Sequence, residues 1–412
     1  FSYSSTTTGI CTINSSTGVI AIVTAGDCVL TATRAVDTNY NQASGNVTIT
    51  IAKATQATVS TSATRTTSTY ADGSTNTIAL TGGSGTGATS FASTTTAVCS
   101  VDPSTGALTV LTAGTCSITA TKAADTNYNQ ATSSITITIN KATQATFSAS
   151  SSPSNTTYGS ASVVTISGTG GSGTGAVSYA STTASVCSVN ASTGVISIVT
   201  AGTCSITATK AADVNYNVAT ASTSVVIGKA TQSTLTLTPA NSSVVFGDGQ
   251  SANVTVGGGS GNGSVSYASN STGICSVNST TGAVTILTAG TCSITVTKAA
   301  DTNYNAATAN ASITVSKASQ AALNVSGNQS LTFSATSPTS QLSVTGGSGT
   351  GTVSYAVDST STGICVVSAG GLVTGLHAGT CTINITKAAA TNYNAATTTY
   401  VITVAKLSLI HI

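Results

Sequence analysis

The stretch VCSVNASTGVISIVTAGTCSITATK, residues 186–210, contains the pattern that decides the fold. Short runs in which apolar and polar residues alternate are separated by turn residues such as those at 190–194. This alternation is typical of β-strands that turn one face toward a core. In the last run Cys204, Ile206 and Ala208 fall on one face, and we expect that face to point inward.

The residues on either side of this stretch extend the pattern over the segment 141–228. Seven strands are predicted there, at 145–149, 162–167, 176–181, 186–189, 195–200, 204–210 and 223–227. Seven short strands with a turn signal between each pair indicate an immunoglobulin-like sandwich of two sheets. The predicted fold class is therefore all-β.

The same segment recurs along the chain with a period of 88 residues. The first cysteine of each pair stands at Cys11, Cys99, Cys187, Cys275 and Cys365, and the second at Cys28, Cys116, Cys204, Cys292 and Cys381. The chain then divides into a partial copy at 1–52 and four full copies at 53–140, 141–228, 229–316 and 317–405. A K-A-[TS]-Q tetrad opens each full copy, and no flexible linker precedes it. We expect a tandem array of about seven-stranded sandwiches that forms an extended rod.

The composition excludes several classes of protein. Only 5% of the 412 residues are charged and 40% are apolar, with 11 Lys and Arg in total. This is too few basic residues for a nucleic-acid partner and too few charges for a coiled coil or a disordered chain. No uninterrupted apolar run is long enough for a membrane span.

Two runs carry a resemblance to a known family. TAVCSVDPSTG at 96–106 and TAGTCSITAT at 112–121 resemble the group 2 bacterial immunoglobulin-like domain, whose usual run is V-D-x-x-G-x-V-T followed by G-T-A-x-I-T-A. Asn127-Tyr128-Asn129 is similar to the N-Y-N-A-A ending of the cysteine-bearing variety of these repeats. The resemblance covers all five copies. It implies the stalk of a large bacterial surface protein or adhesin, with no shared catalytic residues.

The cysteines occur as five pairs with a spacing of 16 or 17 residues, which favours one disulfide in each copy. Free buried cysteines are the alternative, whereas a zinc site would need four ligands and each copy offers only two. A disulfide in each copy implies an oxidising compartment. The expected pairs are Cys11–Cys28, Cys99–Cys116, Cys187–Cys204, Cys275–Cys292 and Cys365–Cys381.

A D-x-N-x-N pattern begins at Asp37, Asp125, Asp213 and Asp301 and is similar to the opening of a calcium loop. A calcium loop also needs a bidentate acid near its end, and the chain contains no Glu. We favour a loop in which Asp and Asn side chains cap backbone amides while Tyr128 packs on the core. No metal, cofactor or catalytic residue is expected.

These observations favour a non-enzymatic stalk of a secreted or cell-surface bacterial protein, stiffened by disulfides. Its partners would be the neighbouring copies, with a host or environmental glycan or protein bound by a tip domain beyond this fragment. One alternative is a glycan-binding module, although no copy contains Trp or a cluster of exposed aromatic residues. Another is the spacer of a secreted enzyme whose catalytic domain lies outside the fragment.

Both ends of the chain indicate a fragment of a longer protein. Residue 1 falls within a copy and is not Met. At the other end, residues 406–412 leave the repeat, and LSLIHI at 407–412 resembles the translation of an adaptor used in sequencing-library preparation. We expect this tail to be an artefact.

Overall fold

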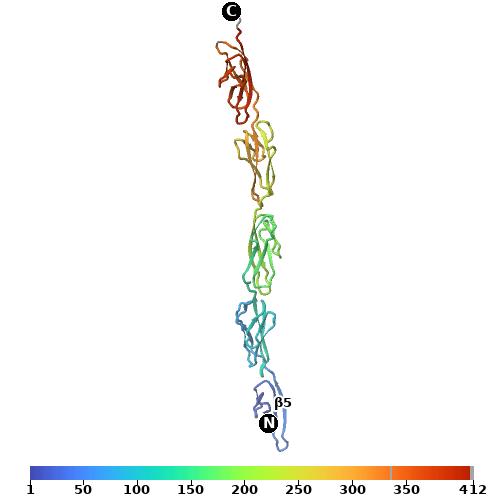
Figure 1. Ribbon diagram of the computed structural model, residues 1–412. Coiled ribbons are helices and arrows are strands. Elements are labelled where there is room, and N and C mark those ends of the chain that lie inside the picture. Colours follow the sequence, from blue (N-terminus) through green and yellow to red (C-terminus); the bar gives the residue numbers. More distant parts are fainter. Residues whose placement is uncertain (335, 409–412) are drawn as a thin grey trace. The chain divides into compact units, whose positions relative to one another are not determined.

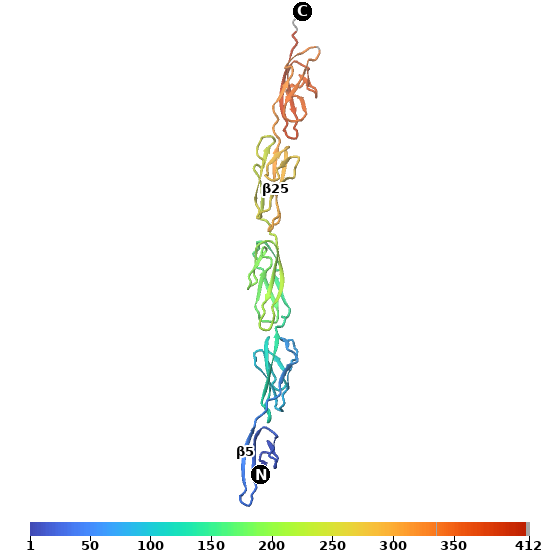
Figure 2. The same ribbon diagram turned by 180° about the vertical axis from the view of Figure 1, so that it is seen from behind.

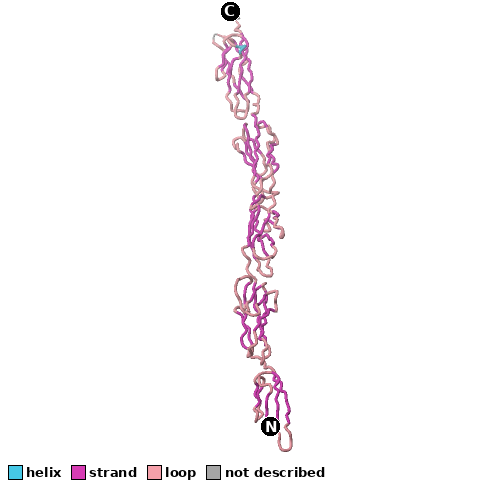
Figure 3. Tube along the Cα trace, turned by 60° about the horizontal axis from the view of Figure 1, so that its bottom comes forward, coloured by secondary structure: helices cyan, strands magenta, loops and turns pink. Residues whose placement is uncertain are grey.

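The computed structural model describes residues 1–334 and 336–408, so most of the predicted tail, 409–412, lies outside it. The described chain is all-β, as predicted. Its only helical element is a short 3-10 turn, η1 (Ser359–Ser361), drawn in cyan in Figure 3. Within the described residues no helix has the length and hydropathy needed to cross a membrane.

The strands recur in the same order in successive copies. The partial copy contains β1 (Ser2–Ser5), β2 (Cys11–Ile13), β3 (Ile20–Ile22), β4 (Gly26–Arg34) and β5 (Ala43–Ile51). The second contains β6 (Val59–Ala63), β7 (Thr67–Thr69), β8 (Ile78–Gly82), β9 (Thr89–Ser93), β10 (Cys99–Val101), β11 (Leu108–Val110), β12 (Gly114–Lys122) and β13 (Ala131–Asn140). The third contains β14 (Phe147–Ser152), β15 (Asn155–Thr157), β16 (Thr165–Gly170), β17 (Val177–Ser181), β18 (Cys187–Val189), β19 (Ile196–Ile198), β20 (Gly202–Lys210) and β21 (Ala219–Gly228).

The last two copies follow the same plan. The fourth contains β22 (Leu235–Pro239), β23 (Ser243–Val245), β24 (Val254–Gly258), β25 (Val265–Ser269), β26 (Cys275–Val277), β27 (Val284–Ile286), β28 (Gly290–Lys298) and β29 (Ala307–Ser316). The fifth contains β30 (Leu323–Ser326), β31 (Ser330–Thr332), β32 (Thr339–Gln341), β33 (Ser343–Gly346), β34 (Val353–Val357), β35 (Cys365–Val367), β36 (Leu372–Gly375), β37 (Gly379–Lys387) and β38 (Ala396–Ala405). β5 is labelled in Figure 1 and β25 in the reverse view of Figure 2.

Each full copy is a sandwich of two sheets. In the third copy one sheet has the order β15-β21-β20-β17. The other has the order β14-β16-β19-β18, since Ile166 N donates to Gly194 O at 2.9 Å and Ile196 N donates to Val164 O at 3.0 Å. These orders correspond to the two sheets of an immunoglobulin sandwich.

The sequence did not predict the short strand near the start of each copy. This strand is β7 in the second copy, where it runs parallel to the last strand, β13, and pairs Thr67 with Thr138 and Thr69 with Asn140. β23 and β31 make the same parallel pairing with β29 and β38. Three residues are too few to show a usable alternation, and in β7 and β15 (Asn155–Thr157) all three are polar. The neighbouring strand, and not the local pattern, therefore defines this element.

The disulfide-linked cysteines lie at the centre of each core. Cys204, Ile206 and Ala208 are no more than 1% exposed, which confirms the predicted inward face of β20. Cys187 on β18 and Cys204 on β20 belong to opposite sheets, and their Cα atoms lie 5.6 Å apart. The structure forms five disulfides, Cys11–Cys28, Cys99–Cys116, Cys187–Cys204, Cys275–Cys292 and Cys365–Cys381.

The chain forms two compact units. The first consists of Phe1–Thr156, Ala161–Val199 and Thr203–Val226. The second begins its continuous part at Ile227 and also includes two short segments of the third copy, Thr157–Ser160 and Thr200–Gly202. Both segments contact the fourth copy, as described below.

Candidate functional site

Each full copy carries a polar loop, which we call the NYN loop, at 125–129, 213–217, 301–305 or 390–394. In the third copy Asp213 shapes this loop, because its Oδ1 accepts hydrogen bonds from Asn215 N at 2.9 Å and Tyr216 N at 2.8 Å. Its Oδ2 accepts from Thr174 N at 2.6 Å. The carboxylate therefore ties the NYN loop to the glycine loop at 171–175, and this arrangement confirms the capping interpretation.

The tetrad that opens the third copy, 141–144, is hydrogen-bonded to the same NYN loop. Ala142 N donates to Asn215 O at 2.8 Å, and Asn217 N donates to Ala142 O at 2.9 Å. Gln144 Nε2 donates to Asn217 O at 3.0 Å, while its Oε1 accepts from Gly173 N at 3.0 Å. The segment between the last strand of one copy and the first strand of the next is therefore hydrogen-bonded along its length.

The middle asparagine of the NYN loop reaches the preceding copy. Asn215 Oδ1 accepts a hydrogen bond from Ala113 N, 2.9 Å away, in the turn before β12. The same bond recurs from Ala25 N to Asn127 at 2.9 Å, from Ala201 N to Asn303 at 2.8 Å and from Ala289 N to Asn392 at 2.8 Å. We call the contact of an NYN loop with the preceding copy a copy junction.

The tyrosine of the NYN loop lies at the copy junction and not on the core of its own copy. The expectation that Tyr128 packs on the core was wrong: it lies beside Ile22 and Val23 of the preceding copy. In the first unit the ring of Tyr216 meets that of Tyr70 edge to face, with centroids 5.6 Å apart. The second unit has the equivalent pairs Tyr158–Tyr304 at 5.6 Å and Phe246–Tyr393 at 5.9 Å.

The fifth copy shows that the aspartate is not required to place the other two side chains. Ala390 stands where the other loops have Asp, yet Asn392 still accepts from Ala289 N and the ring of Tyr393 still meets Phe246. Lys317 Nζ donates to Ala390 O at 2.8 Å, and this bond needs only the backbone. The aspartates therefore reinforce a loop whose path the backbone already defines.

The aspartates of the NYN loops accept backbone N–H groups, which stabilise the charged form. The hydrogen bond from Thr174 N is the main cause that lowers the pKa of Asp213 to about 2, and Tyr216 N and Asn215 N add to it. The corresponding bonds also lower the pKa values of Asp125 and Asp301. Because the folded pKa lies below the ordinary 3.8, the carboxylate stabilises the loop above about pH 4, and this contribution is lost as the pH falls toward 2.

We expect the amides of Thr174, Asn215 and Tyr216 to titrate together in NMR spectra recorded between pH 5 and pH 2, with an apparent pKa of about 2. The amides around Ala390 serve as an internal control, because that loop has no carboxylate. If those amides shift over the same range, or if the amide of Thr174 titrates near the ordinary Asp value, the proposed role of the carboxylate is wrong.

Among the described residues, no three His, Cys, Asp or Glu side chains come together in a group that could hold a metal ion. In the third copy, hydrogen bonds from backbone N–H groups occupy both Asp213 oxygens. The D-x-N-x-N pattern is therefore accounted for by the loop and the junction.

No protein-family model and no curated protein sequence matches the chain. Among solved structures it is similar to Drosophila N-cadherin EC1-4, with 11% identity, a TM-score of 0.25 and coverage of 79% of this chain and 93% of that chain. It is also similar to the protocadherin GammaB4 extracellular domain, with 13% identity, a TM-score of 0.30 and coverage of 98% of this chain and 78% of that chain. A third similar structure is that of domains 1–6 of the surface layer protein SbsC, with 17% identity, a TM-score of 0.22 and coverage of 81% of this chain and 53% of that chain. Scores this low carry no argument about function.

Proposed function

We propose that this chain is a structural stalk of a secreted or cell-surface bacterial protein and that it acts without catalysis. In this proposal each full copy is one folding unit with the boundaries 53–140, 141–228, 229–316 and 317–405. The stalk holds a binding domain away from the surface that anchors it. The sequence resemblance to group 2 bacterial immunoglobulin-like repeats supports this role.

The recurrence of one copy junction is the observation that carries the proposal. An asparagine of each NYN loop accepts a backbone N–H of the preceding copy, at 2.8–2.9 Å in every case. In three of the junctions an aromatic pair packs beside this bond. A contact that repeats in this way limits bending between neighbours, which is the property a stalk requires.

The five disulfides support an extracellular location. Disulfides persist in oxidising compartments and are rare in the cytosol. A buried disulfide also stabilises each copy without reliance on the few charged side chains that this chain contains.

The length of the full chain in solution tests the stalk. Five copies in line, each about 35 Å long, should give a maximum dimension of about 150 Å or more in small-angle X-ray scattering. A variant in which Asn127, Asn215, Asn303 and Asn392 are all replaced by Ala should bend at the junctions and give a broader distribution of shorter distances.

The matched control removes capping side chains that act inside a copy. Asn190, for example, accepts from Ser192 N and Thr193 N in its own turn. The corresponding residues are Asn14, Asp102, Asn190 and Asn278. Replacement of all four by Ala should leave the distance distribution unchanged. A compact wild-type chain, or the same loss of length in both variants, would contradict the stalk.

A further inference from the structure

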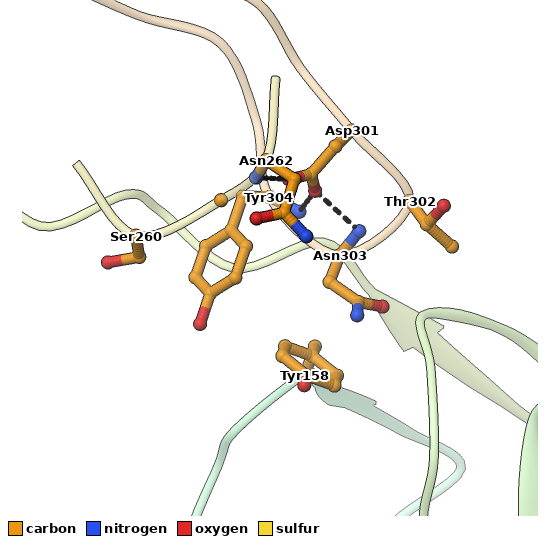
Figure 4. A pocket seen from close by; sticks show the side chains of 8 residues that line it. Tyr158, Ser260, Asn262, Asp301, Thr302, Asn303 and Tyr304 are labelled. Atoms are coloured by element: carbon orange, nitrogen blue, oxygen red, sulfur yellow. Dashed lines mark hydrogen bonds between the residues drawn. The ribbon is translucent and has the colours of Figure 1, made fainter. Parts of the chain in front are cut away.

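A hollow of about 340 Å³ lies at the junction of the third and fourth copies, and all of its lining residues belong to the second unit. Two tyrosines form part of its wall: Tyr158 follows β15, and Tyr304 belongs to the NYN loop. Figure 4 shows the ring of Tyr158 beneath that of Tyr304, with Asn303 and Thr302 to one side and Ser260 to the other. The volume lies within the range of pockets that bind small ligands, about 300–1,000 Å³.

Among the described residues, Tyr158 and Tyr304 form no ring pair within their own copies, which is why the sequence showed no aromatic cluster. The junction brings the two rings together, with their planes at 80° and their centroids 5.6 Å apart. Both side chains are only partly buried. Two neighbouring copies therefore form, at this junction, a partly exposed aromatic pair that neither copy contains by itself.

This junction has one more polar side chain than the junction of the second and third copies. Asn262 occupies the position that is Thr in the other three full copies, for example Thr174. Thr302 stands where the preceding copy has Val214. The hollow therefore has an amide where the equivalent junction has a hydroxyl, and a hydroxyl where it has an apolar side chain. Both Asn262 and Thr302 are exposed.

In the fourth copy a buried side-chain oxygen next to the glycine loop lacks the hydrogen bond that its counterparts accept. In the third copy Gln144 Oε1 accepts from Gly173 N at 3.0 Å. The equivalent Gln232 is 7% exposed, and its Oε1 has no hydrogen-bond partner among the described residues. Its Nε2 still donates to Asn305 O at 2.9 Å, so the side chain is fixed in place. The glycine loop that carries Asn262 therefore lacks the hydrogen bond to this glutamine that Gly85 N, Gly173 N and Gly349 N make in the other full copies.

We propose that this hollow binds a neutral saccharide. The face of an aromatic ring is electron-rich and attracts the C–H groups of a sugar ring, while amide and hydroxyl groups pair with sugar hydroxyls. Asn303 Oδ1 is held by Ala201 N, which leaves Nδ2 as a donor, and Asn262 supplies a second amide. This site goes beyond the stalk role, because it gives one junction a ligand in addition to its mechanical contact.

The charges around the hollow favour a neutral ligand over an anionic one. None of the eight lining residues is basic. The single carboxylate, Asp301, already accepts hydrogen bonds from Asn262 N, Asn303 N and Tyr304 N. A sulfated or carboxylated sugar would meet this negative charge with no cation in the lining to offset it.

Saturation-transfer NMR and calorimetry with the full chain test the site. The probes are cellotetraose, chitotriose and mannotriose, with a heparin-derived tetrasaccharide as the anionic comparison. We expect at least one neutral probe to bind with a Kd of about 1 mM or tighter and the anionic probe to give no saturable signal. Tyr158→Ala and Asn262→Thr should each weaken the binding about tenfold, the change that follows the loss of one good contact.

Two features of the chain supply matched controls. Asn262→Thr introduces the residue that the other copies already carry, so the fold is preserved. Tyr70→Ala removes the tyrosine that corresponds to Tyr158 in the first unit and should leave binding unchanged. The site is ruled out if no neutral probe binds at concentrations well above 1 mM, if only the anionic probe binds, or if Asn262→Thr binds as the wild type does. Equal losses in Tyr70→Ala and Tyr158→Ala also rule it out, and none of these results would bear on the length of the stalk.

Discussion

A chain refolded in the presence of a reductant should unfold at a temperature about 15 °C below that of the oxidised chain. Each disulfide closes a loop of 16 or 17 residues. Closure of a loop of this size stabilises the folded state by about 3 kcal/mol in the chain-entropy model. For a domain the size of one copy, 1 kcal/mol of stability corresponds to about 4–8 °C in the midpoint of unfolding. Loss of the disulfide therefore lowers the unfolding temperature substantially.

The experiment must take the burial of the sulfur atoms into account. All ten cysteines are at most 2% exposed, so a reductant added to the folded chain does not reach them. We therefore propose to unfold the chain in denaturant, reduce it, refold it with the reductant present and record the melting curve by calorimetry. Chain refolded without reductant is the control for losses caused by refolding.

A thiol count supplies the independent check. The unreduced chain, denatured in the presence of a thiol reagent, should release no signal, because the structure leaves no cysteine free among the described residues. Ten reactive thiols, or identical melting curves with and without reductant, would show that the cysteines are buried but unpaired in solution.

Much of each copy could be predicted from the sequence because the information is local. Alternation in Cys204–Lys210 assigns faces within one strand, and turn residues mark where strands end. The 88-residue period then transfers each assignment to every copy. The short strand β15 could not be predicted in this way, because its strand conformation depends on pairing with β21 and not on its own three residues.

The copy junction could not be predicted in the same way. Asn215 and Ala113 lie 102 positions apart, and Tyr70 and Tyr216 lie 146 apart. Their contact depends on how two folded copies dock, and no strand pattern encodes that docking. The usable signal was the recurrence of Asn-Tyr-Asn in every copy together with a Thr-Ala-Gly or His-Ala-Gly turn, which indicates a shared role without naming the partner.

When the chain is pulled from its two ends, its length increases by one step each time a copy unfolds. The disulfide of each copy should make this increase about 60 Å smaller than it would be without the disulfide. In the second copy β7 lies near the start and runs parallel to β13 at the end. Opposite forces on the two ends slide these strands along one another, so their hydrogen bonds are loaded together and the copy opens in one step. The disulfide Cys99–Cys116 then excludes a span of 17 residues from the extension, at about 3.5 Å for each residue.

A single chain can contain both the test and its control. In a variant with Cys99→Ser and Cys116→Ser, force spectroscopy should record one step about 60 Å longer than the steps of the other full copies. The longer step should also occur at lower force, because that copy has lost about 3 kcal/mol of stability. Steps of equal length in this variant would mean that the disulfides do not limit extension. A gradual rise in length without steps would mean that β7 and β13 are peeled apart one pair at a time, and the copies would then be poorly suited to bear load.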